Sequence, residues 1–150
     1  MLYSRAPCTL YLAPQKIMYT KTFEEVLNHF RNIQFEEKFD LIVAIANGGI
    51  IPAAILNQRL DIEIQLLKIN LRDPNQKPKY ESPKLIAPID FDFEEKTILL
   101  VEDRVKTGST LNYAKSLLMQ KAKLVKTFAV NGNADYFLYN EDCFKFPWIV

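Results

Sequence analysis

The residues from Ile98 to Thr110 combine chemical groups that suit a sugar phosphate. An apolar run, Ile98–Val101, ends in two adjacent acids, Glu102 and Asp103, and Thr107-Gly-Ser-Thr110 follows after a short spacer. Carboxylates accept hydrogen bonds from sugar hydroxyls and hold a hydrated divalent cation. Hydroxyls beside the free N–H groups of a helix start favour an anion. The spacing therefore favours a ligand with a diol at one end and a phosphate at the other.

A second candidate, Asn47-Gly48-Gly49, follows another apolar run, Phe39–Ala46. Adjacent glycines let the backbone approach a ligand closely. Both segments also have plain structural interpretations, because many α/β proteins turn from a strand into a helix at such residues without binding phosphate. Neither segment has the Gly-Lys-[Ser/Thr] of a Walker A loop or a Gly-x-Gly-x-x-Gly dinucleotide motif.

The elements that must position these groups alternate between strands and helices. A capping box, Thr22 to Glu25, predicts a helix that ends near Asn32, and the Pro-rich, basic stretch Leu71–Pro88 is expected to be a long loop. Strands are predicted at Phe39–Ala46, Asp61–Asn70, Thr97–Val101, Lys123–Val130 and Tyr136–Tyr139, and helices at Ile51–Arg59 and from Ser109 or Thr110 to about Gln120. Glu102–Ser109 is expected to be a loop.

This alternation predicts a single α/β domain over residues 1–150, with a mainly parallel sheet flanked by helices. Ligands of such sheets bind beyond the carboxyl ends of the strands, where both motifs fall. The aromatic-rich end, residues 136–150, is expected to form a small hood, and residues 71–88 a mobile loop.

Composition narrows the function classes. The net charge is +1, so an anion site must be local and the whole molecule has no strong attraction for nucleic acid or anionic membranes. Two cysteines do not make a disulfide framework, and the single histidine, His29, reads as a solvated helix residue. No run approaches the length of a membrane span or a secretory signal, which predicts a cytoplasmic protein.

Two motifs resemble those of a known family. Val101–Thr110 on its apolar strand looks like the 5-phosphoribosyl-1-pyrophosphate (PRPP) signature of type I phosphoribosyltransferases. Ala44–Ala53 resembles the pyrophosphate loop of the small bacterial xanthine–guanine phosphoribosyltransferases, and Phe146-Pro147-Trp148 is similar to their Pro-Trp end. The matches keep the family's order over roughly residues 39–148.

The resemblance implies a role for each matching residue. Glu102 and Asp103 would contact the ribose hydroxyls, and Asp103 would help to hold Mg²⁺. Lys106, Thr107, Gly108, Ser109 and Thr110 would grip the 5-phosphate, and Asn47, Gly48 and Gly49 the pyrophosphate. The implied reaction is displacement of pyrophosphate at the anomeric carbon by a nucleobase nitrogen, as in purine salvage.

The family also closes a mobile loop over the reacting centre, and closure excludes water that would otherwise hydrolyse PRPP. Residues 71–88 stand at that place in the chain. Lys77 roughly matches a basic residue of the family's loop, which implies a catalytic role beside that of Lys106. The alternative for Lys77 is a solvated surface charge.

The base-binding part departs from the family pattern. The 6-oxopurine enzymes carry an Asp where this chain has Lys106, and a protonated lysine cannot act as a general base. They also place a lysine near Val130 and a basic residue at Asn47. Cys143 and Phe144 occupy the region of the family's stacking aromatic, and Phe144 is the expected platform.

Two other functions stay open from the sequence. Some members of the fold bind PRPP or a nucleotide and regulate without catalysis, and an unrelated α/β domain with a coincidental loop is the third hypothesis. Relatives of this size commonly form dimers or tetramers, so the resemblance implies a homo-oligomer.

Overall fold

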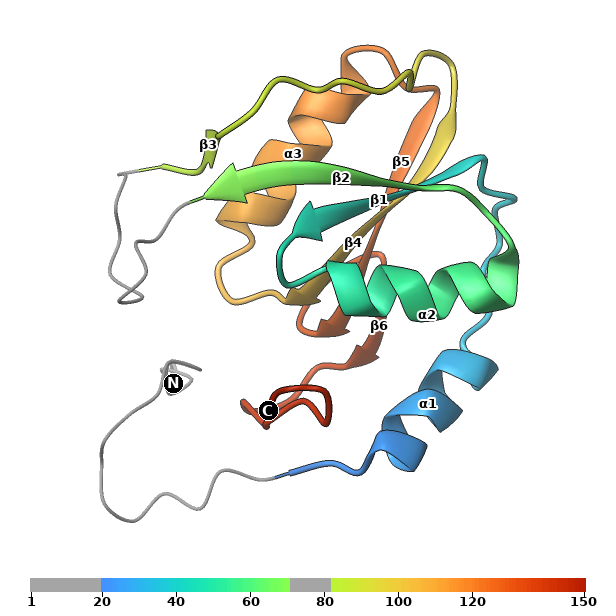
Figure 1. Ribbon diagram of the computed structural model, residues 1–150, viewed down its shortest axis with the longest axis vertical. Coiled ribbons are helices and arrows are strands. Elements are labelled where there is room, and N and C mark those ends of the chain that lie inside the picture. The colour runs from blue at the N-terminus through green and yellow to red at the C-terminus, as the bar shows by residue number, and fades with distance from the viewer. Residues whose placement is uncertain (1–19, 71–81) are drawn as a thin grey trace.

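The computed structural model describes residues 20–70 and 82–150. Its centre is a six-stranded sheet in the order β3-β2-β1-β4-β5-β6, in which only β3 is antiparallel to its neighbour. The strands are β1 (Leu41–Ala46), β2 (Ile64–Asn70), β3 (Lys84–Leu85), β4 (Thr97–Arg104), β5 (Leu124–Asn131) and β6 (Tyr136–Tyr139). The predicted α/β fold with a mainly parallel sheet is therefore confirmed (Figure 1).

Helices cover both faces of the sheet. The helices are α1 (Phe23–Asn32), α2 (Ile50–Leu60) and α3 (Ser109–Met119). Ala53 and Leu56 of α2 pack with Ile42 of β1 in one apolar cluster, which also contains buried residues of α1. Leu118 of α3 packs with Val43 of β1 in a second cluster on the opposite face. The central strands are therefore buried on both faces, which is why they read as unbroken apolar runs.

The first helix begins where its capping box places it. The Thr22 side chain accepts a hydrogen bond from Glu25 N, and the Glu25 carboxylate accepts one from Thr22 N at 2.7 Å. These two bonds satisfy donors that would otherwise have no partner in the helix. Lys145, near the C-terminus, bridges to Thr20 just before this helix, so the two ends of the described chain meet here.

The strand β4 is longer than the sequence predicts. Glu102, Asp103 and Arg104 belong to the strand rather than to the loop expected from Glu102 to Ser109, because β4 pairs with β5 as far as Arg104 opposite Asn131. Backbone pairing does not depend on side-chain polarity, so polar residues can continue a strand at its end. The acids are thereby held by the sheet itself.

Two further predicted segments share residues with the sheet. The expected loop 71–88 contains the short strand β3, which pairs antiparallel with the end of β2, and residues 71–81 lie outside the described residues, as does Lys77. Within the expected hood 136–150, β6 joins the main sheet beside β5, and a hood formed by the rest of this segment stays a prediction. Of residues 136–150, those after Tyr139 lie outside the main sheet.

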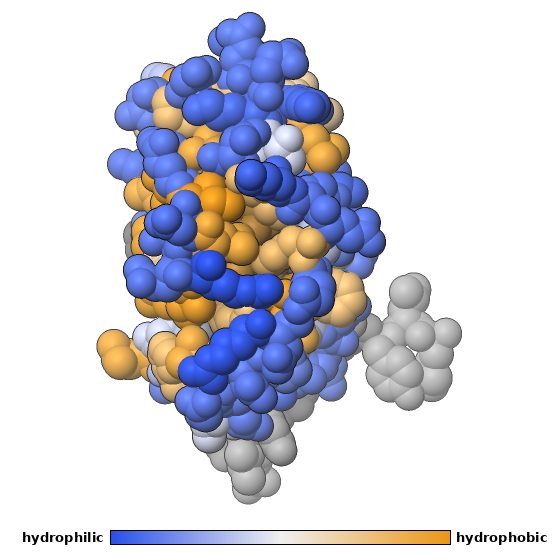
Figure 2. Space-filling view, turned by 90° about the vertical axis from the view of Figure 1, so that its right-hand side faces the viewer, coloured by the Kyte–Doolittle hydropathy of each residue, from blue (hydrophilic) through white to orange (hydrophobic). Residues whose placement is uncertain are grey.

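The amino ends of the strands carry a hollow of their own. Residues 37–40 and 60–63 line it, at the start of β1 and the end of α2. Figure 2 looks onto this end of the molecule, where apolar surface shows between charged side chains. Both candidate motifs lie at the other end of the strands. No helix within the described ranges is long and apolar enough to cross a membrane.

Candidate functional site

The two motifs of the sequence meet at the carboxyl ends of β1 and β4. Gly48 lies directly against the Asp103 carboxylate, since a Cβ atom built on Gly48 would stand 2.6 Å from Asp103 Oδ1 and 2.8 Å from Oδ2. These residues are 55 positions apart in the chain, and the parallel pairing of β1 with β4 brings them together. A side chain at position 48 would therefore have to displace the Asp103 carboxylate.

The turn that follows β1 is tightly built. Asn47, Gly48 and Gly49 form it, and the peptide bond between Ala46 and Asn47 is cis. A Cβ on Gly49 would lie 2.3 Å from the backbone oxygen of Val101, so only glycine fits there. The turn leads straight into α2, whose first N–H groups point toward the carboxyl edge of the sheet.

The two acids share a crowded environment. The Glu102 carboxylate accepts a hydrogen bond from Asp103 N at 3.0 Å. Burial first, and then the neighbouring charge of Asp103, raise the pKa of Glu102 well above its usual range. Two carboxylates this close favour binding a shared cation. They also favour accepting hydrogen bonds from hydroxyl groups. Either partner lowers the repulsion between the two acids.

The loop after the acids presents hydroxyl groups at the start of α3. Gly108 is the N-cap, with φ of 84°. The sequence predicts Ser109 or Thr110 at this position, and that prediction is wrong by one or two residues. The left-handed backbone of Gly108 turns the chain into the helix at that point. The Thr107 hydroxyl lies 3.0 Å from that of Ser109 and accepts a hydrogen bond from Ser109 N. Lys106 and Thr107 are exposed beside this helix start.

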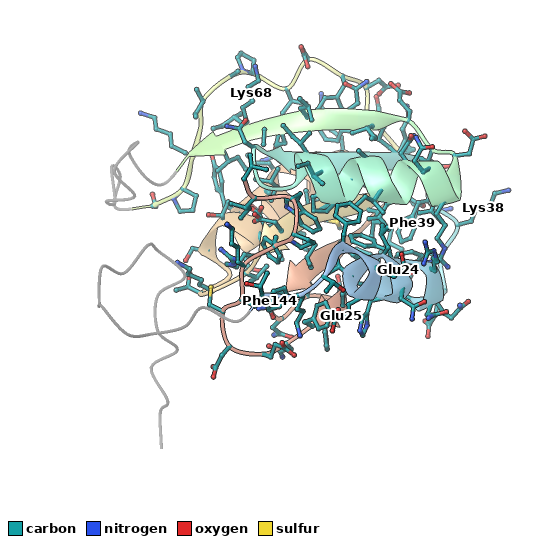
Figure 3. The ribbon with its side chains drawn as sticks, turned by 60° about the horizontal axis from the view of Figure 1, so that its bottom comes forward. Glu24, Glu25, Lys38, Phe39, Lys68 and Phe144 are labelled. Atoms are coloured by element: carbon teal, nitrogen blue, oxygen red, sulfur yellow. The ribbon has the colours of Figure 1, made fainter. Side chains whose placement is uncertain are left out.

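The segment after β6 is tied to the strand ends by buried side chains. Asn131 of β5 donates to the backbone oxygen of Glu141 at 3.2 Å and accepts from its N–H at 3.1 Å. Arg104 of β4 donates from Nη2 to the backbone oxygen of Phe144 at 2.7 Å. This segment therefore covers the same edge of the sheet as the two motifs, and Figure 3 shows Phe144 at the end opposite Phe39 and Lys38.

The residues predicted to contact a base lie in this region but face inward. The side chains of Val130 and Phe144 are 0% and 1% exposed, and the Phe144 ring packs edge-on against Tyr139 and Phe146. Cys143 beside it is half-buried. A ligand at this edge does not reach the faces of these two buried side chains in this conformation, so base contact at these positions stays a prediction.

Arg104, which the sequence analysis did not single out, also lies at this edge of the sheet. Its guanidinium carbon lies 4.3 Å from the centre of the Phe146 ring, and among residues 20–70 and 82–150 its buried Nε has no hydrogen-bond partner. Burial lowers the pKa of Arg104, and the charge of Asp103 opposes that shift. The only signal in the sequence was its place directly after two acids at the end of an apolar strand.

Comparison with known proteins decides the family. The model of the phosphoribosyl transferase domain matches residues 19–142. This chain belongs to that phosphoribosyltransferase family. The match spans both motifs and the whole described sheet, so the family inferred from the two motifs and the reaction class of phosphoribosyl transfer are both confirmed.

Named relatives of this phosphoribosyltransferase point the same way. It is 34% identical over 122 residues to a xanthine-guanine phosphoribosyltransferase of Desulfotalea psychrophila, covering 73% of this chain and 70% of the relative. It is 24% identical over 144 residues to a hypoxanthine-guanine phosphoribosyltransferase of Streptococcus pyogenes, covering 84% and 78%. A crystal structure of a purine phosphoribosyltransferase from Pyrococcus horikoshii superposes with a TM-score of 0.72 at 26% identity, covering 87% and 92%.

Proposed function

We propose that this phosphoribosyltransferase transfers the 5-phosphoribosyl group of PRPP to a purine base and releases pyrophosphate. The observation that carries the proposal is the contact of Gly48 with the Asp103 carboxylate. It puts the loop suited to a diphosphate and the acids suited to a ribose side by side, as PRPP requires. The relatives named for xanthine, hypoxanthine and guanine support a purine as the acceptor.

The proposed roles follow the geometry of the strand ends. Glu102 and Asp103 accept hydrogen bonds from the ribose hydroxyls, and the backbone of residues 107–110 with its hydroxyls holds the 5-phosphate at the start of α3. The turn at Asn47–Gly49 brings backbone N–H groups to the pyrophosphate. The three parts lie along one edge of the sheet, so a single ligand spans them.

The donor set also fits Mg²⁺. This ion binds proteins through one or two carboxylates and completes its shell with water and substrate oxygens. Asp103, with Glu102 beside it, supplies such carboxylates, and the described residues hold no group of three or more acidic, His or Cys ligands that would form a complete protein cage. When bound with PRPP, Mg²⁺ would neutralise charge on the leaving pyrophosphate.

In the proposed reaction, a nitrogen of the base forms a bond to the anomeric carbon while the bond from that carbon to pyrophosphate breaks, and the proton of that nitrogen passes to water or to the released pyrophosphate. Lys106 is positively charged at neutral pH and therefore meets negative charge on phosphate or pyrophosphate rather than accepting the proton of the base. Lys77 would do the same from residues 71–81, which lie outside the described ranges.

The direct test is turnover. The full chain is incubated with PRPP, Mg²⁺ and hypoxanthine, guanine, xanthine or adenine, and released pyrophosphate and the nucleotide are measured. We expect transfer to at least one purine, and loss of about 100-fold or more in the Asp103→Asn variant because the negative charge proposed to hold Mg²⁺ is lost. A matched Glu63→Gln variant changes one acid at the amino end of β2 and should keep full activity. Absence of transfer to every base would overturn the proposal.

A Lys106→Asp variant separates two roles of position 106. If this position limits base activation, as the departure from the family pattern implies, purine transfer rises in the variant. If Lys106 is a phosphate or pyrophosphate ligand, PRPP binding weakens instead, and calorimetry of PRPP binding distinguishes the two results. We expect weaker PRPP binding, because Lys106 adjoins the hydroxyl-bearing loop.

We also propose that the protein acts as a homo-oligomer, as relatives of this size commonly do. Sedimentation of the full chain at micromolar concentration measures this directly. A dimer or tetramer is expected, and a monomer would contradict it.

A further inference from the structure

Cys143 lies in the C-terminal segment after β6, where the chain is held on both sides. Glu141, two positions before it, accepts a hydrogen bond from Asn131 at its backbone oxygen. Phe144, directly after it, accepts one from Arg104. The Cys143 side chain is half-buried, and its sulfur is disulfide-bonded rather than a free thiol. A covalent bond at this position therefore acts on a stretch that the strand ends already hold.

The sequence offers a single partner for that bond. The chain has two cysteines, Cys8 and Cys143, and the structure holds one copy of the chain. Cys8 lies outside the described residues. Because there is no third cysteine, a disulfide of Cys143 within one chain leaves Cys8 as its partner.

The described start of the chain lies beside the same stretch. Thr20 bridges to Lys145, two positions after Cys143. The Lys21 ammonium lies 2.7 Å from a carboxylate oxygen of Glu141, two positions before Cys143. The chain therefore enters the described part of the molecule next to Cys143.

The length of chain between Cys8 and Thr20 allows a return to Cys143. Twelve residues span it, and such a length reaches at most about 40 Å when fully extended. A disulfide needs the two Cα atoms to lie about 5.5–6 Å apart. Thr20 already lies next to the target through its bridge to Lys145, so closing the bond adds little loss of chain entropy.

We propose that Cys8 and Cys143 form a reversible disulfide that ties residues 1–19 to the C-terminal segment and keeps Phe144 turned inward. The bond itself is independent of the proposed function, whereas its effect on transfer rests on that function. Phe144 is the residue expected to stack on a base, yet its ring is buried and packs edge-on against Tyr139 and Phe146. Because Cys143 directly precedes Phe144, a bond that fixes Cys143 also restricts the backbone from which the ring would turn outward.

Formation of the bond needs a disulfide as oxidant, such as glutathione disulfide. One protein thiolate attacks a sulfur of the oxidant, the S–S bond of the oxidant breaks, and one glutathione leaves. The second protein thiolate then attacks the mixed disulfide and releases the other glutathione. Two protons and two electrons pass from the protein to the oxidant, and a dithiol such as dithiothreitol reverses the reaction.

The test uses the full chain in two redox states. One sample is equilibrated with glutathione disulfide and the other with dithiothreitol, and the reagents are removed. Free thiols are counted by alkylation under denaturing conditions and mass spectrometry. Melting temperature, PRPP affinity and kcat/KM for hypoxanthine and guanine are measured on both samples. Cys8→Ser is the matched variant, because it removes the bond without changing the C-terminal segment.

We expect two alkylated thiols in the reduced chain and none in the oxidised monomer. Oxidation should raise the melting temperature by about 5 °C or more, because a bond between distant residues restricts the unfolded chain. It should lower kcat/KM by about tenfold and change PRPP affinity by less than about threefold, since residues 102–110 lie outside the tied segment. Cys8→Ser should keep the activity and melting temperature of the reduced protein under both conditions.

Two free thiols after oxidation, or a disulfide-linked dimer on a non-reducing gel, would overturn the proposed bond. Equal kcat/KM in the two redox states would overturn its effect on Phe144, and so would a Cys8→Ser variant that still loses activity on oxidation. A chain that transfers no base in either state would overturn the proposed function instead. In that case the thiol count and the melting temperature still decide on the bond.

Discussion

At the residue scale, the site depends on the close contacts of two glycines. Gly48 and Gly49 are neighbours in one turn, yet an added Cβ would meet different obstacles. At Gly48 it would meet the Asp103 carboxylate, which can rotate away, and at Gly49 the backbone oxygen of Val101, which cannot. The first glycine therefore protects the position of a functional group, and the second protects the fold.

This difference gives a prediction for two alanine variants. Gly48→Ala should displace the Asp103 carboxylate and lower kcat/KM by about tenfold or more, because misplaced contacts raise the barrier steeply. Its melting temperature should stay within about 2 °C of wild type. Gly49→Ala should instead destabilise the fold by about 3 kcal/mol, measured by urea unfolding. Equal stability loss in both variants would contradict this account.

The pKa of Glu102 belongs to the same scale. Burial and then the charge of Asp103 raise this pKa, which favours the neutral carboxyl group. The two acids lie where sugar hydroxyls and a cation are expected. The stability that the apo protein loses by crowding two acids is the usual cost of a binding site held ready for its ligand.

At the element scale, caps and side-chain clamps fix the parts that carry the site. The helix α1 starts with the Thr22–Glu25 capping box, and its exposed Phe23 lies edge-on to Trp148 of the C-terminal segment. The strands β5 and β6 are joined by Asp135, which accepts two hydrogen bonds from Thr127. The cap and the Asp135 hydrogen bonds are local in the chain, whereas the contact of Phe23 with Trp148 joins α1 to the C-terminal segment.

Removing the helix cap should cost a defined amount of stability. Thr22→Ala loses the bond from Glu25 N, and we expect the free energy of unfolding to fall by about 1 kcal/mol. Thermal melting would then shift by roughly 2–4 °C. Glu24→Ala, which removes only the exposed pair with Arg31, is the control and should change stability by less than about 0.5 kcal/mol. A Thr22 variant as stable as this control would refute the role of the cap.

The hydrogen bonds between Thr127 and Asp135 predict that stability depends on pH. Partial burial alone would raise the pKa of Asp135, but the hydrogen bonds from Thr127 outweigh it and lower this pKa below its usual value. A carboxylate whose pKa is lower in the folded than in the unfolded chain stabilises the fold when the pH is above its unfolded pKa, near 4. That stabilisation is lost as the pH falls through the folded pKa. Asp135→Ala should therefore cost about 1–2 kcal/mol at pH 7 and less at pH 3.

Urea unfolding at pH 7, 5 and 3 measures this trend. Asp90→Ala, which removes an exposed acid between β3 and β4, serves as the control and should show little change across the range. If the loss of stability in Asp135→Ala grew on acidification, the trend would have the wrong sign. That result would exclude a stabilising role for the hydrogen bonds between Asp135 and Thr127.

At the scale of the whole molecule, ligand and fold are thermodynamically linked. PRPP touches residues from β1, β4 and α3 in the proposed complex, so it binds only the folded chain. Ligand at 100 times its Kd stabilises a protein by about 2.7 kcal/mol.

For a domain of 150 residues, this corresponds to roughly 5–10 °C in melting temperature. We expect PRPP with Mg²⁺ to give such a shift and PRPP with a metal chelator to give a smaller one. Ribose 5-phosphate, which lacks the pyrophosphate, should also stabilise less. If neither PRPP nor any nucleoside monophosphate shifts the melting temperature, the proposed function fails at this scale.

The sequence by itself determined the alternation of elements and the chemistry of the strand ends. Apolar runs buried on both faces, a capping box and acid- or glycine-bearing turns are local patterns, because a few residues fix each one. The order of the strands along the chain then placed Asn47–Gly49 and Glu102–Thr110 at one edge. Family, fold class and reaction class followed from these residues.

Only the tertiary structure decided which distant groups touch. The approach of Gly48 to Asp103, the extension of β4 through Arg104, and the bond from Arg104 to Phe144 across 40 positions all depend on strand pairing and on the path of the C-terminal segment. A local pattern carries no information about partners so far away in the chain. The fold therefore turned Arg104, an ordinary charged residue in the sequence, into a half-buried side chain that holds the C-terminal segment.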